Sequence, residues 1–225
     1  MIAITKKISA EKSNKRVLKN TYALLALSLI PTIFGSIIGT SISWSLVQSY
    51  PLLSSIAFFA VSMGIFAAID KTKDTGTGVA LLLTFTGLMG IMLGPLLSVA
   101  LSSERTQHLV VLAFGTTAMI FATMSVIAAI TPASMSKGWG SYLIWGLVCT
   151  IAISIIGMFV ATSTMTLVSS ALAIIIFSAY LVHDLQRIID GGETNYVMAT
   201  LNLYLSIYNI FTSVLRLLMS FGADE

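Results

Sequence analysis

The 225 residues are 56% hydrophobic and only 9% charged, whereas about a quarter of the residues of a soluble domain are charged. This composition excludes an ordinary water-soluble domain and predicts that lipid surrounds most of the chain. The net charge of +3 does not indicate a nucleic-acid-binding face, because six of the twelve Lys and Arg residues lie in the first 19 positions.

The chain opens with a polar segment, residues 1–19, that shows no apolar periodicity. We expect this segment to be a flexible tail, followed by a transmembrane domain over residues 20–225. Such a tail anchors the orientation of the first span, and it is also a segment that a processive protease could grip. Its positive side chains are Lys6, Lys7, Lys12, Lys15, Arg16 and Lys19.

Seven apolar stretches follow, each close to the ~20 residues that a helix needs to cross a bilayer. Short breaks that contain charge, glycine or proline separate most of them. The expected spans cover approximately residues 22–47, 52–69, 79–101, 109–130, 141–161, 166–188 and 197–220. Pro31 and Pro95 should kink the first and third spans. The predicted fold class is therefore all-α, a polytopic integral membrane protein with seven transmembrane helices.

The distribution of positive charge predicts the orientation in the membrane, because Lys and Arg in short loops stay on the cytoplasmic side. With the tail inside, Lys71, Lys73, Lys137 and Arg187 also fall inside, whereas Arg105 and Arg216 fall outside. We therefore expect a cytoplasmic N-terminus and, after an odd number of spans, a C-terminus on the other side.

Two small-xxx-small patterns lie in the apolar stretches: Gly35 with Gly39 in the first span, and Gly90 with Gly94 in the third. Glycines at this spacing let helix backbones approach closely. A dimer contact is one reading of them. In a chain with seven helices, packing between helices of the same chain is the better prediction.

Ionisable residues at membrane depth are the first candidates for function, because a charge near the bilayer centre is costly. The sixth span carries Asp184, about one and a half turns before its end, with Tyr180 at i−4 and Arg187 at i+3 on the same face. The seventh span carries a polar stripe at helical spacing. The stripe consists of Asn202, Ser206, Asn209 and Ser213.

A short connection, residues 190–196, joins the sixth and seventh spans, so the two helices should be antiparallel neighbours with Asp184 facing Asn202 and Ser206. One hypothesis is a polar cluster that binds a cation or titrates a proton. The alternative is that Asp184 is an interfacial residue, paired with Arg187 and reached by headgroup water. The residues leave both readings open.

The usual enzyme motifs are missing from the sequence. It has no HExxH, GxSxG, GxxxxGK[ST] or GxGxxG pattern, and the lone Cys149 allows neither a disulfide within the chain nor a Cys/His zinc site. An intramembrane aspartyl protease needs a second carboxylate opposite Asp184, and the seventh span has none. We predict a protein that is not an enzyme and carries no cofactor.

The carboxyl-terminal third, from Asp184 through the GGETNY run at 191–196 to Phe211, resembles the signature of the transmembrane Bax-inhibitor-motif (Bax inhibitor-1) family. Residues 85–96 and 17–22 add supporting matches. The resemblance implies six helices around a central seventh. The chain is most similar to the bacterial YccA-type branch, whose members are inner-membrane proteins that restrain the membrane-bound, ATP-dependent protease FtsH. A regulatory role in membrane protein quality control is therefore implied.

Other members of the family act as pH-sensitive calcium leaks, in which an aspartate on the sixth helix and another on the seventh share a proton. Asp184 matches the first position, and Ser206 stands at the second. A like-charged pair cannot form here, so the resemblance favours the protease regulator. A cation held by Asp184, Asn202 and Ser206 remains the alternative.

Overall fold

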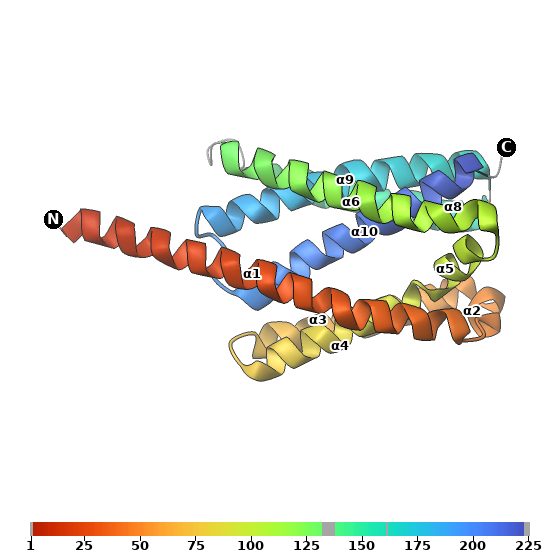
Figure 1. Cartoon of the computed structure of the whole chain (residues 1–225), viewed down its shortest axis with the longest axis horizontal. Coiled ribbons are helices and arrows are strands. Elements are labelled where there is room, and N and C mark those ends of the chain that lie inside the picture. The colour runs from red at the N-terminus through yellow and green to blue at the C-terminus, as the bar shows by residue number, and fades with distance from the viewer. Residues whose placement is uncertain (1, 132–137, 161, 223–225) are drawn as a thin grey trace.

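The computed structural model describes residues 2–131, 138–160 and 162–222, and within these ranges all regular structure is helical. Most of the helices run roughly along one axis (Figure 1). Their bounds are α1 Ile2–Ser41, α2 Ser45–Ser49, α3 Pro51–Thr72, α4 Gly76–Met92, α5 Gly94–Leu101, α6 Glu104–Ile130, α8 Trp139–Phe159, α9 Ser163–Ile189 and α10 Tyr196–Gly222.

The two ends of the bundle differ in what they contain. We call the end where α1 begins the tail end; the α3–α4 and α9–α10 connections lie there too. We call the opposite end, with α2, α5 and the C-terminus, the far end (Figure 1). Lys137 lies outside the described residues, so the structure adds nothing to the orientation argument at that position.

The expected seven spans are confirmed. Six helices are long and apolar enough to cross a membrane, and α4 with α5 forms a seventh, broken span bent by 42°. The break falls at Leu93, two residues before Pro95. A proline at this position cannot donate the helical hydrogen bond to Ile91, which accounts for the expected kink. At Pro31, by contrast, α1 continues as one helix.

The first span differs from the prediction at both ends. α1 stops at Ser41, so residues 42–47 do not belong to it, and a short separate helix, α2, follows. The indole Nε1 of Trp44 donates a hydrogen bond to the Gly39 carbonyl at 2.8 Å, which satisfies one of the free carbonyls of the last turn. At the other end, α1 begins at Ile2, so the expected flexible tail is helical over residues 2–19.

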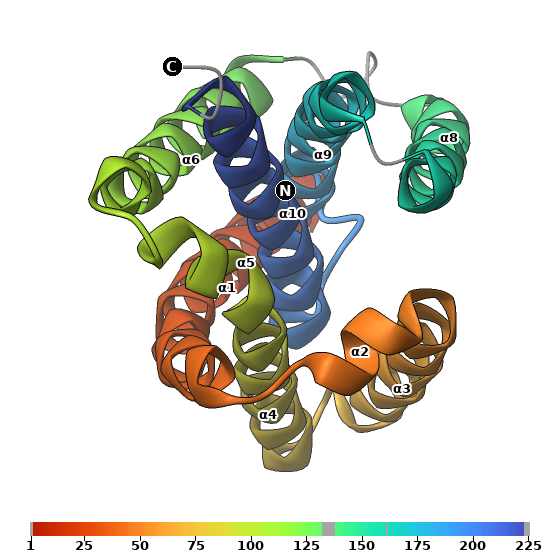
Figure 2. The same cartoon turned by 90° about the vertical axis from the view of Figure 1, so that its right-hand side faces the viewer.

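Helix α10 lies at the centre of the bundle, in contact with α1, α3, α4, α5, α6 and α9 (Figure 2). Of its most apolar stretch, 44% is buried, compared with 6% for α3. The implied arrangement around a central seventh helix is therefore confirmed. Helix α8 lies at the periphery and packs mainly on α9.

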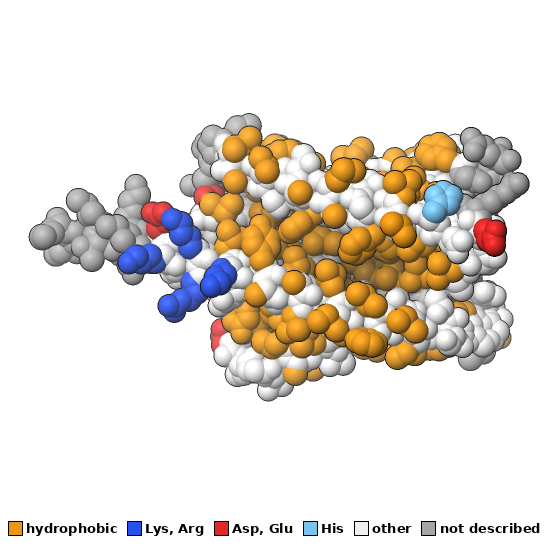
Figure 3. All heavy atoms as spheres, viewed as in Figure 1, with side chains coloured by type: hydrophobic (Ala, Val, Ile, Leu, Met, Phe, Trp, Pro, Cys, Tyr) orange, Lys and Arg blue, Asp and Glu red, His pale blue; other side chains and the backbone are white. Residues whose placement is uncertain are grey.

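Apolar side chains cover the middle of the surface, and positive side chains gather at the tail end (Figure 3). Phe59 of α3 and Trp145 of α8 are 61% and 69% exposed. Exposed apolar area on this scale is rare on soluble monomers. We call this band of exposed apolar side chains the apolar belt, and it is the surface that lipid tails cover.

Helices α1 and α4 touch backbone to backbone at the two small-xxx-small patterns. A Cβ added to Gly90 would collide with the carbonyl of Thr32, and one added to Gly94 would collide with the backbone of Gly39. The prediction that these glycines pack helices of the same chain is confirmed. The four residues concerned are Gly35, Gly39, Gly90 and Gly94.

The α9–α10 connection begins with a glycine that the geometry requires. Gly191 has a φ of +76°, and Gly192 N–H donates to the Arg187 carbonyl at 2.8 Å, as in a Schellman C-cap. A Cβ on Gly191 would also meet the side chain of Asn14. Asn14 Nδ2 donates to the Ile189 carbonyl at 3.0 Å, so α1 is tied to the end of α9.

Asn195 joins the start of α10 to the α3–α4 connection. Its Oδ1 accepts hydrogen bonds from the backbone N–H groups of Val197 and Met198 at 3.0 and 3.1 Å, which makes it the N-cap of α10. Its Nδ2 donates to the Lys73 carbonyl at 3.2 Å and to Asp74 Oδ1 at 2.8 Å. One side chain therefore caps the central helix and holds a neighbouring loop.

The glycine contact predicts a stability difference. Gly90→Ala should lower the free energy of unfolding by about 1–3 kcal/mol, because the added methyl group forces α1 and α4 apart. Gly64→Ala in α3 is the matched control, since nothing lies within 4 Å of a Cβ there. Thermal unfolding of the purified variants checks this, and equal melting temperatures for the two would contradict it.

The two roles of Asn195 can be separated by substitution. Asn195→Ala should lower the free energy of unfolding by about 1 kcal/mol. It should also speed hydrogen exchange both at the start of α10 and in residues 73–75. Asn195→Asp keeps the cap but loses the donor and faces Asp74 with a like charge, so only residues 73–75 should exchange faster. Hydrogen exchange measured by mass spectrometry distinguishes the two roles. Identical exchange profiles for the two variants would refute the bridging role.

Candidate functional site

Asp184 is a buried carboxylate on α9, 9% exposed, close to the tail end. Leu181, Leu185 and Ile188 around it on the same helix are almost fully buried, so the sequence places this carboxyl on the packed side of α9. No hydrogen bond or ion pair joins Asp184 to any other part of the described chain. Charges close to membrane depth are normally paired, which makes its isolation the unusual feature of this helix.

Arg187, the expected partner, is turned elsewhere. Its side chain is 45% exposed, and its Nη2 lies 3.8 Å from Oε2 of Glu193 in the α9–α10 connection. Glu193 Oε1 accepts a hydrogen bond from the Asn195 backbone at 2.9 Å. The connection therefore holds Arg187 near the carboxylate of Glu193, and no ion pair forms between Arg187 and Asp184.

Tyr180 shares a helix face with Asp184, as the spacing predicts, but the two side chains are not hydrogen-bonded. Tyr180 is half-buried, and its ring centroid lies 6.1 Å from that of Phe177. Its contact with the neighbouring ring gives it a packing role.

The polar stripe of α10 is divided along its length. Asn202 is half-buried and Ser206 is 4% exposed, both in the half of α10 that is nearer the tail end. Asn209 is the middle residue of α10, and its Nδ2 donates to the Leu205 carbonyl at 2.7 Å. Helices α9 and α10 are neighbours, as expected, yet no hydrogen bond connects Asp184 to the stripe within the described residues.

Two tyrosines of α10 anchor it to α1 and α4, and the sequence analysis assigned them no role. The hydroxyl of Tyr204 lies 2.9 Å from Thr32 Oγ1 and donates to the Thr86 carbonyl at 3.2 Å. The hydroxyl of Tyr208 donates to the Met89 carbonyl at 3.1 Å. Tyrosines four residues apart on an apolar helix are the sequence signal that could have indicated this, because buried tyrosines seek a partner for their hydroxyls.

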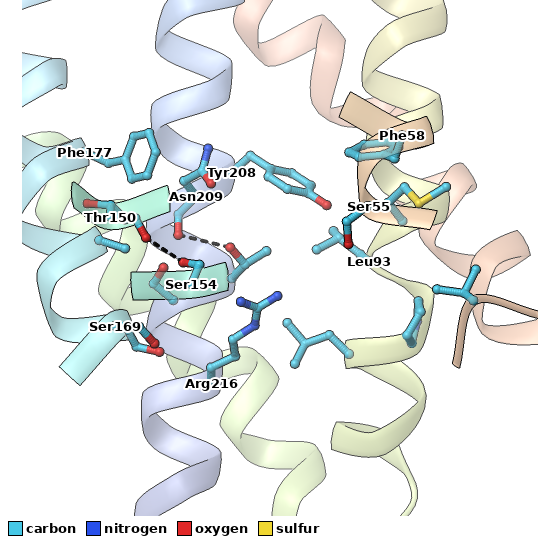
Figure 4. Close-up of a pocket in the computed structure, with 18 of the residues that line it drawn as sticks. Ser55, Phe58, Leu93, Thr150, Ser154, Ser169, Phe177, Tyr208, Asn209 and Arg216 are labelled. Atoms are coloured by element: carbon cyan, nitrogen blue, oxygen red, sulfur yellow. Dashed lines mark hydrogen bonds between the residues drawn. The ribbon is translucent and has the colours of Figure 1, made fainter. Parts of the chain in front are cut away.

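A cavity of about 460 Å³ opens at the far end, and we call it the far-end cavity. Helices α3, α8, α9 and α10 and the α4–α5 break all contribute to its wall (Figure 4). Of the candidates predicted from the sequence, Asn209 lines it, whereas Asp184, Asn202 and Ser206 do not. Besides Asn209, the polar part of the wall contains hydroxyl side chains and one arginine. They are Ser54, Ser55, Thr150, Ser154, Ser169, Ser170, Tyr208, Thr212, Ser213 and Arg216.

The expected cation cluster is thus spread over two places. Asp184 of α9 and Asn202 and Ser206 of α10 lie outside the far-end cavity, whereas Asn209 lines it. Across the described ranges, no three His, Cys, Asp or Glu side chains converge as metal ligands.

Comparison with known proteins places this architecture in a family. The chain is 35% identical over 206 residues to the Modulator of FtsH protease YccA of Escherichia coli, a match that covers 92% of this chain and 90% of that protein. An uncharacterized membrane protein of Vibrio cholerae is 30% identical over 97% of this chain and 95% of its own. An uncharacterized protein of Neisseria meningitidis is 32% identical, and that match covers 95% of this chain and 94% of the Neisseria protein.

A family model agrees with these relatives. The model described as inhibitor of apoptosis-promoting Bax1 matches residues 14–223, which is nearly the whole chain. The match includes the seven spans, the GGETNY connection and the central α10. With its helical bundle and apolar belt, this chain is a membrane protein that belongs to the Bax inhibitor-1 family.

Proposed function

We propose that this protein is a multi-pass regulator in the bacterial inner membrane that associates with the membrane-bound, ATP-dependent protease FtsH and modulates it in membrane protein quality control. The observation that carries the proposal is the similarity to the Modulator of FtsH protease YccA. The match covers nearly the whole length of both chains, so it involves the whole bundle and not one shared motif. We assign the protein no catalytic activity.

Charge supports an orientation with the tail end in the cytoplasm. Positive residues near span ends stay on that side, and the tail end carries most of them (Figure 3). The C-terminus then lies on the outer side. The described cations at the tail end are Lys12, Lys15, Arg16, Lys19, Lys71, Lys73 and Arg187.

Two parts of the molecule are accessible to a membrane-anchored protease. The first part of α1 projects beyond the bundle at the tail end (Figure 1), within reach of a cytoplasmic domain. Helices α3 and α8 expose apolar faces in the membrane belt, and α8 packs mainly on α9. We infer that the partner contacts the bundle through these lipid-facing helices and reaches the N-terminal helix from the cytoplasm.

Association with FtsH can be tested directly. The tagged full-length chain, solubilised from bacterial membranes in mild detergent, should co-purify with FtsH. Its overproduction should slow the degradation of a membrane protein that FtsH degrades. An unrelated seven-helix protein made to the same level is the control for crowding of the membrane. Absence of FtsH from the purified material, together with an unchanged degradation rate, would refute the proposal.

A pH-sensitive cation or calcium leak is the second candidate function, and the isolation of Asp184 is the observation that favours it. A buried carboxylate without a partner is costly, so a bound cation or a proton would relieve it. Ser206, 4% exposed, occupies the position where the leak-type relatives are expected to carry a second aspartate. A shared proton between two carboxylates is therefore not available here, which is why we rank the leak second.

The leak reading predicts a measurable flux. Proteoliposomes of the purified protein should release calcium at a rate that changes with pH, and Asp184→Asn should abolish that change. Asp70→Asn is the matched control, because Asp70 is exposed and forms an ion pair with Lys73 at 2.9 Å that raises the pKa of Lys73. Release no faster than from protein-free vesicles, with folded protein present, would exclude the leak.

A further inference from the structure

Two serines that line the far-end cavity are buried as residues but have hydroxyls that are not hydrogen-bonded to the described chain. Ser170 of α9 is 3% exposed and Ser213 of α10 is 6% exposed, and both line the cavity. Neither hydroxyl forms a hydrogen bond with any other described residue. Neither hydroxyl oxygen is among the fully buried atoms of the described chain, so both are accessible from the cavity and free to bond a polar group that enters it.

The other hydroxyls of the wall behave differently. Thr150 and Ser154 of α8 each donate to a backbone carbonyl of their own helix at 2.8 Å, which is the usual bond for such residues within a helix. Thr212 donates to the Asn209 carbonyl at 3.1 Å (Figure 4). The hydroxyl of Ser54 in α3 forms no hydrogen bond within the described chain either, but this residue is only half-buried. The two wall serines that are both buried and unbonded therefore lie on α9 and α10.

Arg216 supplies the charge of the cavity. It lies on α10, six residues before the end of that helix at Gly222, or ~9 Å along the axis. Its guanidinium points from α10 toward the cavity (Figure 4). It forms no ion pair with any described residue, and none of the residues that line the cavity is acidic. An unpaired guanidinium beside free hydroxyl donors is complementary to an anion, and guanidinium groups pair with both phosphate and carboxylate.

The position of the cavity within the membrane belt identifies the source of the anion. Its wall includes Ser55 of α3 and Ser154 of α8, and no substantial contact joins these two helices. On their other faces both helices are apolar; Ile56 of α3 and Ile155 of α8 are 58% and 44% exposed. A ligand that enters between α3 and α8 therefore comes from lipid and has an apolar part.

We propose that the far-end cavity binds an anionic phospholipid, with the phosphate paired to Arg216 and hydrogen-bonded by the hydroxyls of Ser170 and Ser213. The acyl chains extend from the cavity into the bilayer between α3 and α8. At ~9 Å from the end of α10, the arginine lies at a depth from which its side chain reaches headgroup level. This site is separate from Asp184 and does not depend on the proposed partnership with FtsH.

Lipid binding to the purified full-length chain tests the proposal. Phosphatidylglycerol, titrated in detergent and followed by thermal unfolding and native mass spectrometry, should bind more tightly than phosphatidylcholine with the same acyl chains. Arg216→Gln should weaken phosphatidylglycerol binding about tenfold, because a charge-assisted pair is lost. Lys71→Gln, an exposed cation at the tail end, removes the same charge and should leave the affinity unchanged.

The serine pair gives an independent test with small, fold-preserving changes. Without lipid, the double variant Ser170→Ala, Ser213→Ala should be about as stable as the parent, because neither hydroxyl forms a hydrogen bond within the described chain. With phosphatidylglycerol it should gain less stability than the parent does. Equal lipid affinity in the parent and the double variant would overturn the proposal, as would equal losses for Arg216→Gln and Lys71→Gln.

The source of the phosphate is tested by a water-soluble probe. Glycerol phosphate carries the same anion without acyl chains, and it should bind far more weakly than phosphatidylglycerol. Binding of comparable strength would show that the cavity takes a soluble phosphate compound and would overturn the assignment to lipid.

Discussion

The bundle depends on the close approach of α1 and α4 at their glycines. A hydrophobic driving force is absent between helices in lipid, so backbone contact at Gly90 and Thr32 replaces it. The same approach brings Thr32 of α1 and the Thr86 carbonyl of α4 to one point, where the Tyr204 hydroxyl meets both. The position of the central helix α10 therefore follows from the glycines of two other helices.

The remaining helices pack around that centre, and their order explains where the cavity lies. Helix α10 follows α9 through a short connection that contains Gly191 and the N-cap residue Asn195. Helix α8 packs on α9 and has no substantial contact with α3. The space between α3 and α8 at the far end is consequently left to the side chains of α9 and α10, and these are largely serine, threonine and asparagine.

Hydropathy and spacing were sufficient for the spans, the kink at Pro95 and the glycine contact, because lipid leaves a helix few other ways to bury its backbone. They failed where a contact links distant residues. The i, i+3 spacing predicted that Arg187 lies near Asp184. The α9–α10 connection instead brings Glu193 to 3.8 Å from Arg187. The far-end cavity was missed because six separate parts of the chain form its wall, and only their tertiary arrangement brings Ser170 of α9 and Ser213 of α10 to one cavity.

Arg216 of α10 and Asp184 of α9 bear on the choice between regulator and leak. A cation that approached Asp184 from the far end would first meet Arg216, which no described acidic residue neutralises, and would then pass Tyr208 and Tyr204, whose hydroxyls are engaged with α4 and α1. Like charges repel most strongly where water is scarce. A phosphate at Arg216 would remove that repulsion, so an anionic lipid in the cavity and a cation at Asp184 would favour each other electrostatically.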